Sequence, residues 1–134
     1  MDWKLEVVVV PVSDVDRAKR FYSEQMGFVV DVDHRAGEGF RVVQMTPPGS
    51  ACSITIGTGL VKSQPGSLQG LQLVVSDIER ARAELVARGV DVSPIQHFVD
   101  GIPQEGRGED WNSFIFFSDP DGNGWTVQEA PAGH

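Results

Sequence analysis

Short apolar runs rich in β-branched and aromatic residues alternate along this chain with two segments of helical periodicity. Runs that alternate every second residue between turn residues favour strands, whereas apolar residues at i, i+3 and i+4 favour an amphipathic helix. The predicted strands are residues 5–10, 28–32, 40–45, 53–56, 71–75, 90–92, 114–117 and 125–128. The predicted helices are residues 14–26, with a stripe of Val15, Ala18, Phe21 and Tyr22, and residues 77–88, with a stripe of Ile78, Ala81 and Leu85.

Both helices have recognisable ends. Ser13 and Ser76 stand where an N-cap is expected, and Asp16 and Glu79 follow three residues later in a pattern similar to a capping box. Each helix segment is followed by a glycine, Gly27 in one case and Gly89 in the other, which is a common C-terminal stop.

The chain contains an internal repeat. Residues 12–18 (VSDVDRA) return as residues 75–81 (VSDIERA), an offset of 63 residues, and each copy follows a predicted strand and opens a predicted helix. The turn-like residues 46–50 and 119–123 also correspond, because each precedes a closing strand. The repeat predicts an α+β fold of two tandem βαβββ modules, about 4–61 and 69–130, within a single domain of residues 1–134. We expect the helices to lie outside concave mixed sheets whose inner faces meet around a cavity.

Composition narrows the classes of partner. The 134 residues are 40% hydrophobic and 22% charged, with a net charge of −8 and a pI near 4.7. Such an acidic chain is repelled by phosphate backbones and anionic lipid, so nucleic acid and membranes are not expected partners. The chain shows no apolar run of membrane-spanning length and no secretory layout at Met1, so we expect a cytoplasmic protein. The single Cys52 excludes an intrachain disulfide and a CxxC metal site.

Three stretches, taken together, resemble one known family. PVSDVDRAKRFYSEQMGF, LVVSDIERARAELVARGV and FFSDPDGNGWTVQE occur in this order, and they are similar to the vicinal oxygen chelate superfamily, which includes glyoxalase I, extradiol dioxygenases and bleomycin-resistance proteins. The resemblance covers residues 5–129 or so. It implies the paired βαβββ fold and a homodimer.

The same resemblance gives a test for metal. Metal-dependent members would ligate from positions that match Val7, Ser53, Gly70 and Thr126 in this sequence, and none of these four side chains is an imidazole, a thiolate or a carboxylate. The remaining candidate ligands show no recognisable ligand spacing; they are Glu6, His34, His97 and Glu129. We therefore expect no metal and no other cofactor.

In place of a metal site, we expect a ligand pocket lined by neutral groups. Strand alternation turns one set of polar and apolar side chains toward the same interior, and the irregular segment 100–113 is predicted to be a mobile connection, with Trp111 and Arg107 as candidate lid residues. The predicted ligand-binding residues are Val7, Val9, Ser53, Thr55, Gly70, Gln72, His97, Trp111, Thr126 and Gln128. Asp119 and Asp121 are interpreted as turn residues, because Asp-Pro-Asp-Gly is typical turn chemistry.

Two functional hypotheses follow. The first is a metal-independent protein that binds or sequesters a small apolar or aromatic compound. The second is an enzyme, either a metal-dependent lyase, isomerase or dioxygenase of the same superfamily with unorthodox ligands, or a metal-free catalyst in the same cleft. No nucleophile motif or phosphate loop is present in the sequence, so the catalytic residues are unknown. The absence of the family's metal ligands favours the first hypothesis.

Overall fold

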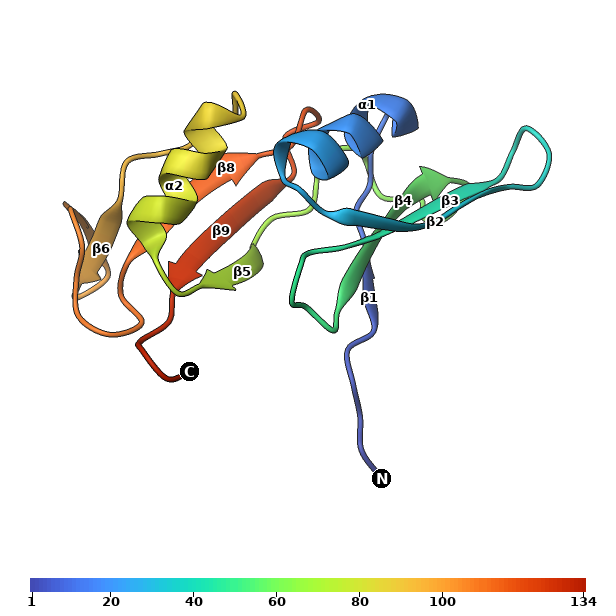
Figure 1. Ribbon diagram of the computed structural model, residues 1–134. Helices are drawn as coiled ribbons and strands as arrows, with labels where there is room; N and C mark the ends of the chain where they lie inside the picture. The colour runs from blue at the N-terminus through green and yellow to red at the C-terminus, as the bar shows by residue number, and fades with distance from the viewer. The chain divides into compact units, whose positions relative to one another are not determined.

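A computed structural model describes the whole chain, residues 1–134, as two compact units (Figure 1). The first unit comprises Met1–Leu68 together with the turn Asp119–Asn123, and the second comprises Gln69–Ser118 and Gly124–His134. Each unit contains one β-sheet and the helix that packs on it, which confirms the α+β fold of two βαβββ modules. No helix combines the length and the apolar character needed to cross a membrane.

The first unit is a four-stranded mixed sheet of order β1-β4-β3-β2. Its strands are β1 (Val7–Val9), β2 (Val29–Arg35), β3 (Arg41–Thr46) and β4 (Ser53–Thr58), and β1 pairs with β4 in parallel while the other pairs are antiparallel. Helix α1 (Val15–Arg20) packs on β4. The core between them contains Ala18, Val43, Met45, Ile54 and Ile56, all buried.

Helix α1 continues directly into η1 (Phe21–Gln25), one turn of π-helix. The amide of Met26 donates to the carbonyl oxygen of Phe21 at 3.0 Å, a spacing of five residues instead of four. The adjacent residues Phe21 and Tyr22 are both buried, with their rings in edge contact at 5.1 Å, and Tyr22 also stacks on Phe28 at 5.7 Å. Two neighbouring aromatic side chains therefore enter one core.

The second unit is a five-stranded sheet of order β5-β9-β8-β6-β7. Its strands are β5 (Leu71–Val75), β6 (Gln96–Val99), β7 (Ile102–Glu105), β8 (Phe114–Ser118) and β9 (Gly124–Glu129), with β5 and β9 parallel. Helix α2 (Ile78–Ala87) crosses β8 and β9 (Figure 1). The covered face contributes Ile115, Phe117, Trp125 and Val127 to the core, together with Ile78 and Leu85 of the helix.

One strand prediction was wrong, and two strands, β6 and β7, were not predicted. Residues 90–92 form no strand; Val90 and Val92 are buried in the connection that follows α2, so their β-branched side chains reflect packing and not a ladder. The segment after Asp100 contains strand β7, which pairs with β6 through the turn at Asp100 and Gly101. Both turn residues have positive φ, 50° and 79°, as a two-residue type I′ hairpin requires.

The predicted N-caps were also one residue out. Asp14 and Asp77 cap the helices, because their carboxylates accept hydrogen bonds from the amides of Arg17 and Arg80, each at 3.1 Å. Ser13 instead donates its hydroxyl to Asp121. A carboxylate at the N-cap also interacts favourably with the helix dipole, which a serine hydroxyl does only weakly.

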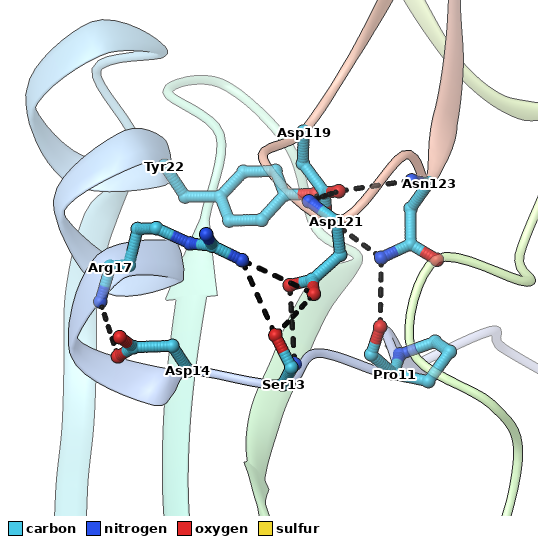
Figure 2. A network of polar contacts seen from close by, with 8 residues as sticks. All are labelled: Pro11, Ser13, Asp14, Arg17, Tyr22, Asp119, Asp121 and Asn123. Atoms are coloured by element: carbon cyan, nitrogen blue, oxygen red, sulfur yellow. Dashed lines mark hydrogen bonds and ion pairs between the residues drawn. The ribbon is translucent and has the colours of Figure 1, made fainter.

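A buried carboxylate holds the turn Asp119–Asn123 in the first unit (Figure 2). Oδ1 of Asp119 accepts from the amides of Asp121 and Asn123, both at 2.9 Å. Oδ2 accepts from the Tyr22 hydroxyl and from Nδ2 of Asn123, both at 2.8 Å. These four hydrogen bonds satisfy a group whose burial would otherwise be costly, so the prediction that Asp119 serves the turn agrees with its contacts.

The rest of the turn makes further contacts with the same unit. Asn123, which is fully buried, donates to the carbonyl oxygen of Pro11 at 2.8 Å and accepts from the amide of Leu68 at 3.0 Å. On the outside, Asp121 accepts from the hydroxyl of Ser13 at 2.5 Å and pairs with Arg17 at 3.3 Å (Figure 2). The turn therefore contacts both the segment that leads into α1, at Pro11 and Ser13, and the helix itself, at Arg17.

Replacing Asn123 with alanine should destabilise the protein by about 3 kcal/mol, because the Pro11 carbonyl and the Leu68 amide lose their buried partner. Tyr22→Phe should cost less, about 1 kcal/mol, because Asp119 keeps three of its hydrogen bonds. Urea unfolding measures both values. Ser118→Ala, an exposed position beside the turn, is the control, and equal losses for all three variants would contradict this account.

Candidate functional site

The second sheet has one face covered by α2 and an opposite face that no helix of its unit covers. We call this opposite side the open face. The register pairs Phe114 with Gln128, Phe116 and Gln72 with Thr126, and Val74 with Gln128. Laterally paired residues point to the same side of a sheet. The open face over β5, β9 and β8 therefore presents Gln72, Val74, Phe114, Phe116, Thr126 and Gln128.

Three phenylalanines form a row on the open face. Phe98 of β6 contacts Phe114 edge to face with ring centroids 5.4 Å apart, and Phe114 stacks with Phe116 at 6.3 Å and an interplanar angle of 14°. All three are half-buried, so each ring keeps part of its surface in solvent. Such a row offers a flat apolar area at low entropic cost, because phenylalanine has only two side-chain torsions.

Two glutamine side chains form a hydrogen-bonded chain beside the row. Nε2 of Gln72 donates to Oε1 of Gln128 at 2.6 Å, and Nε2 of Gln128 donates to the backbone oxygen of Trp111 at 2.7 Å. The hydroxyl of Thr126 makes no hydrogen bond with any other group of the protein. The polar groups over β5 and β9 are therefore neutral, and some of their hydrogen-bonding capacity is unused.

The segment around Trp111 is anchored, which corrects the expectation of a mobile connection. The amide side chain of Asn112 pairs with the backbone of Phe98, accepting from its nitrogen at 2.9 Å and donating to its oxygen at 2.8 Å. Arg107 forms an ion pair with Glu129 at 2.5 Å, and this hydrogen bond raises the pKa of the Arg107 guanidinium. Arg107 is thus bound to a carboxylate of its own chain.

Trp111 has an unusual backbone conformation. Its φ of 63° lies in the left-handed region, which is strained for a bulky residue and is frequent at functional positions. The indole is 40% exposed and meets the ring of His134 edge to face at 4.7 Å. Its backbone contact with Gln128 places it next to the open face of the second sheet.

The first sheet also has a face opposite its helix, which carries four of the predicted residues. Val7 pairs with Ser53 and Val9 with Thr55, and the hydroxyls of Ser53 and Thr46 lie 2.6 Å apart. Thr46 also donates to Asp31, a residue at the irregularity between Val30 and Val32 in β2. Ser53 and Thr55 are buried, so hydroxyls rather than apolar groups occupy the centre of this face.

Two predicted site residues lie elsewhere. Gly70 precedes β5 with a φ of 85° and offers no side chain. His97 follows Gln96, whose lateral partner is Phe114, so its side chain points to the other side of the sheet and its Nδ1 lies 2.9 Å from the oxygen of Gly106. The predicted repeat correspondence of Ser53 with Thr126 is two residues out, because the pair Val9–Thr55 matches the pair Gln72–Thr126.

A hollow of about 410 Å³ lies in the first unit between the start of α1 and the β2–β3 hairpin. Its floor contains Arg41, whose guanidinium bonds Asp33 through Nε at 3.0 Å and Nη2 at 2.9 Å, and Asp16 through Nη1 at 2.8 Å. These bonds lower the pKa of both carboxyls and raise that of Arg41. Every nitrogen of the guanidinium is engaged, so this cluster supports the structure and is a poor ligand site.

Sequence reasoning placed Gln72, Thr126 and Gln128 on a common face, as the register shows, but it missed the phenylalanine row. Phe114 and Phe116 alternate with the buried Ile115 and Phe117, and this run of four apolar residues gave no sign of which pair faces a helix. Phe98 became visible only through the pairing of β6 with β8. No group of three or more His, Cys, Asp or Glu side chains is arranged to hold a metal ion.

Comparison with known proteins identifies the family. The model of the Glyoxalase/Bleomycin resistance protein/Dioxygenase superfamily matches residues 4–127. The chain therefore belongs to this superfamily, which agrees with the two βαβββ modules described above.

Several solved structures are similar over nearly their whole length. TnmS3, an antibiotic binding protein from Streptomyces sp. CB03234, is 32% identical, with 96% of this chain and 97% of that chain covered and a TM-score of 0.77. A glyoxalase/bleomycin resistance protein from the same strain is 33% identical, with coverage of 93% and 99% and a TM-score of 0.73. In the comparison of sequences, the uncharacterized protein YetH of Bacillus subtilis is 24% identical to this chain, with 94% of this chain and 98% of YetH covered.

Proposed function

We propose that this protein binds and sequesters a small, flat, apolar or aromatic compound, without metal. The observation that carries the proposal is the row of Phe98, Phe114 and Phe116 on the open face of the second sheet, beside the neutral groups of Gln72, Thr126 and Gln128. An apolar surface with a few oriented polar groups is the usual constitution of a small-molecule site. The chain is similar to TnmS3, an antibiotic binding protein, and this similarity supports the binding of a small molecule.

The affinity in this proposal comes mainly from contact with the aromatic row. Over β5, β9 and β8 the open face has no ionisable side chain, and Glu105 lies two strands beyond β8, on β7. A ligand that stacks on Phe114 and Phe116 gains dispersion and apolar burial. In the first unit, the sheet face opposite α1 carries a similar set of valines and hydroxyls, and Val7, Val9, Ser53 and Thr55 are proposed as ligand contacts of that face.

Nile red, a neutral planar dye, should bind the wild-type protein, and Phe116→Ser should weaken binding about tenfold through loss of aromatic contact. Phe40→Ser is the matched control, because Phe40 is an exposed phenylalanine of the first unit outside the row. Fluorescence titration gives the dissociation constants. Equal weakening by both substitutions would place the dye elsewhere.

Metal independence is part of the same proposal. It is supported by the side chains at the family's ligand positions, where Val7, Gly70 and Thr126 provide no imidazole, thiolate or carboxylate, and the residue that matches Thr126 in the first sheet is Thr55, another hydroxyl. A neutral hydroxyl is a poor ligand for transition metals.

Purified protein should therefore contain far less than one equivalent of transition metal per chain, and chelation with EDTA should leave Nile red affinity unchanged. Elemental analysis measures the first and repeat titration the second. Stoichiometric metal that is lost on mutating Glu6 or His97 would favour the alternative, a metal-dependent lyase, isomerase or dioxygenase. Recovery of a chemically altered compound without metal would favour a metal-free enzyme.

We also propose that a second copy of this chain is a partner. Strand β2 is an edge strand, exposed along its length, and Val29 and Val32 are 55% and 43% exposed on the face that also presents Val7. Trp3 is 88% exposed and Leu5 continues the same alternation. Val29 and Val32 lie on the edge strand β2, whereas Trp3, Leu5 and Val7 lie at the opposite edge of the sheet. Exposed apolar side chains on an edge strand are typical of protein interfaces, so the proposed interface is built on Val29 and Val32.

Sedimentation equilibrium should give twice the chain mass of 14.6 kDa for the wild type. The double substitution Val29→Glu and Val32→Glu should give the monomer mass, because two desolvated carboxylates oppose association. Val86→Glu, on the exposed side of α2, should leave the dimer intact. A monomeric wild type would contradict the proposal.

A further inference from the structure

Two hydrogen bonds link Gln72, Gln128 and the backbone oxygen of Trp111 on the open face, and both can run in only one direction. The Trp111 oxygen determines that direction. The backbone oxygen of Trp111 can only accept, so Gln128 must present its amide nitrogen there, at 2.7 Å. Oε1 of Gln128 is then turned toward Gln72 and can only accept, so Gln72 must present its own nitrogen, at 2.6 Å. Neither amide can be flipped without placing two acceptors against each other.

This order leaves a defined group at the near end. Oε1 of Gln72 accepts no hydrogen bond from any group of the protein, and Gln72 is exposed on the edge strand β5. Its lateral partner is Thr126, whose own partner on the other side is Phe116. An oriented acceptor therefore lies at the margin of the aromatic row, two strands from Phe116.

Resting on the proposed function, we propose that the ligand is an aromatic compound with an uncharged hydroxyl group, and that Gln72 Oε1 accepts the hydrogen bond of this hydroxyl. Thr126 both donates and accepts, so it cannot distinguish a hydroxyl from an ether. The Gln72 oxygen can, because it requires a donor. Gln72 is thereby a specificity-determining residue of the site.

The charges of the site select the neutral form of the ligand. Gln72, Val74, Phe114, Phe116, Thr126 and Gln128 include no cation that could pair with a phenolate or a carboxylate. The guanidinium of Arg107 is already paired with Glu129, whose neighbour Gln128 points to the other side of the sheet, and the net charge of the protein is −8. An anionic ring substituent would lose its hydration without gaining a counter-charge.

Four matched probes test the inference by isothermal titration calorimetry: naphthalene, 2-naphthol, 2-methoxynaphthalene and 2-naphthoate. With wild-type protein at pH 7, 2-naphthol should bind about five- to tenfold more tightly than 2-methoxynaphthalene, the range expected for one neutral hydrogen bond. The anionic 2-naphthoate should bind most weakly of the four.

Gln72→Met should remove the preference for 2-naphthol over 2-methoxynaphthalene by weakening only the former, because methionine keeps the length of the side chain and loses the acceptor. Gln104→Met is the control. Gln104 is an exposed glutamine of β7 whose lateral partner is His97, so it points away from the open face, and the preference should persist. Thermal melting confirms that both variants are folded.

The outcomes separate the two proposals. Equal affinity of wild-type protein for 2-naphthol and 2-methoxynaphthalene, or a preference that survives Gln72→Met, would overturn the inference about Gln72 while leaving the aromatic site intact. Failure of all four probes to bind would contradict the proposed function itself, and the inference with it.

Discussion

The arrangement of the first unit depends on one buried carboxylate, that of Asp119. A carboxylate removed from water is tolerated only when its lone pairs are occupied, and Asp119 accepts four hydrogen bonds from the turn amides, Tyr22 and Asn123. Two of these donors are themselves fixed, Tyr22 by the π-helical turn and Asn123 by Pro11 and Leu68. The geometry of the turn, the helix and the chain entering it is thus determined together.

Both sheets follow the same physical scheme. One face of each packs against its helix and provides the core, and the opposite face mixes polar groups with apolar ones. The difference lies in the side chains. The first sheet presents valines and hydroxyls, whereas the second adds three phenylalanines and an oriented pair of glutamines. We therefore propose that the aromatic site lies on the second sheet.

Within its superfamily, this chain retains the scaffold and has neutral groups at the positions from which metal would be bound. A hydroxyl such as that of Thr126 can orient a ligand but cannot polarise a substrate as a metal ion does. The anchored loop around Trp111 fits the same interpretation. Its hydrogen bonds with Phe98 and Gln128 fix the loop beside the proposed site, and such preorganisation lowers the entropic cost of binding.

The sequence by itself determined the modules, the helices and the face that Gln72, Thr126 and Gln128 share, because repeats and side-chain periodicity are local properties of the chain. Only the tertiary structure decided which aspartate caps each helix, that Asp100 and Gly101 form a hairpin, and that Phe98 joins Phe114 and Phe116. These features depend on hydrogen-bond partners and strand neighbours distant in the sequence. The direction of the glutamine chain likewise follows from the backbone oxygen of Trp111, a contact that no sequence pattern records.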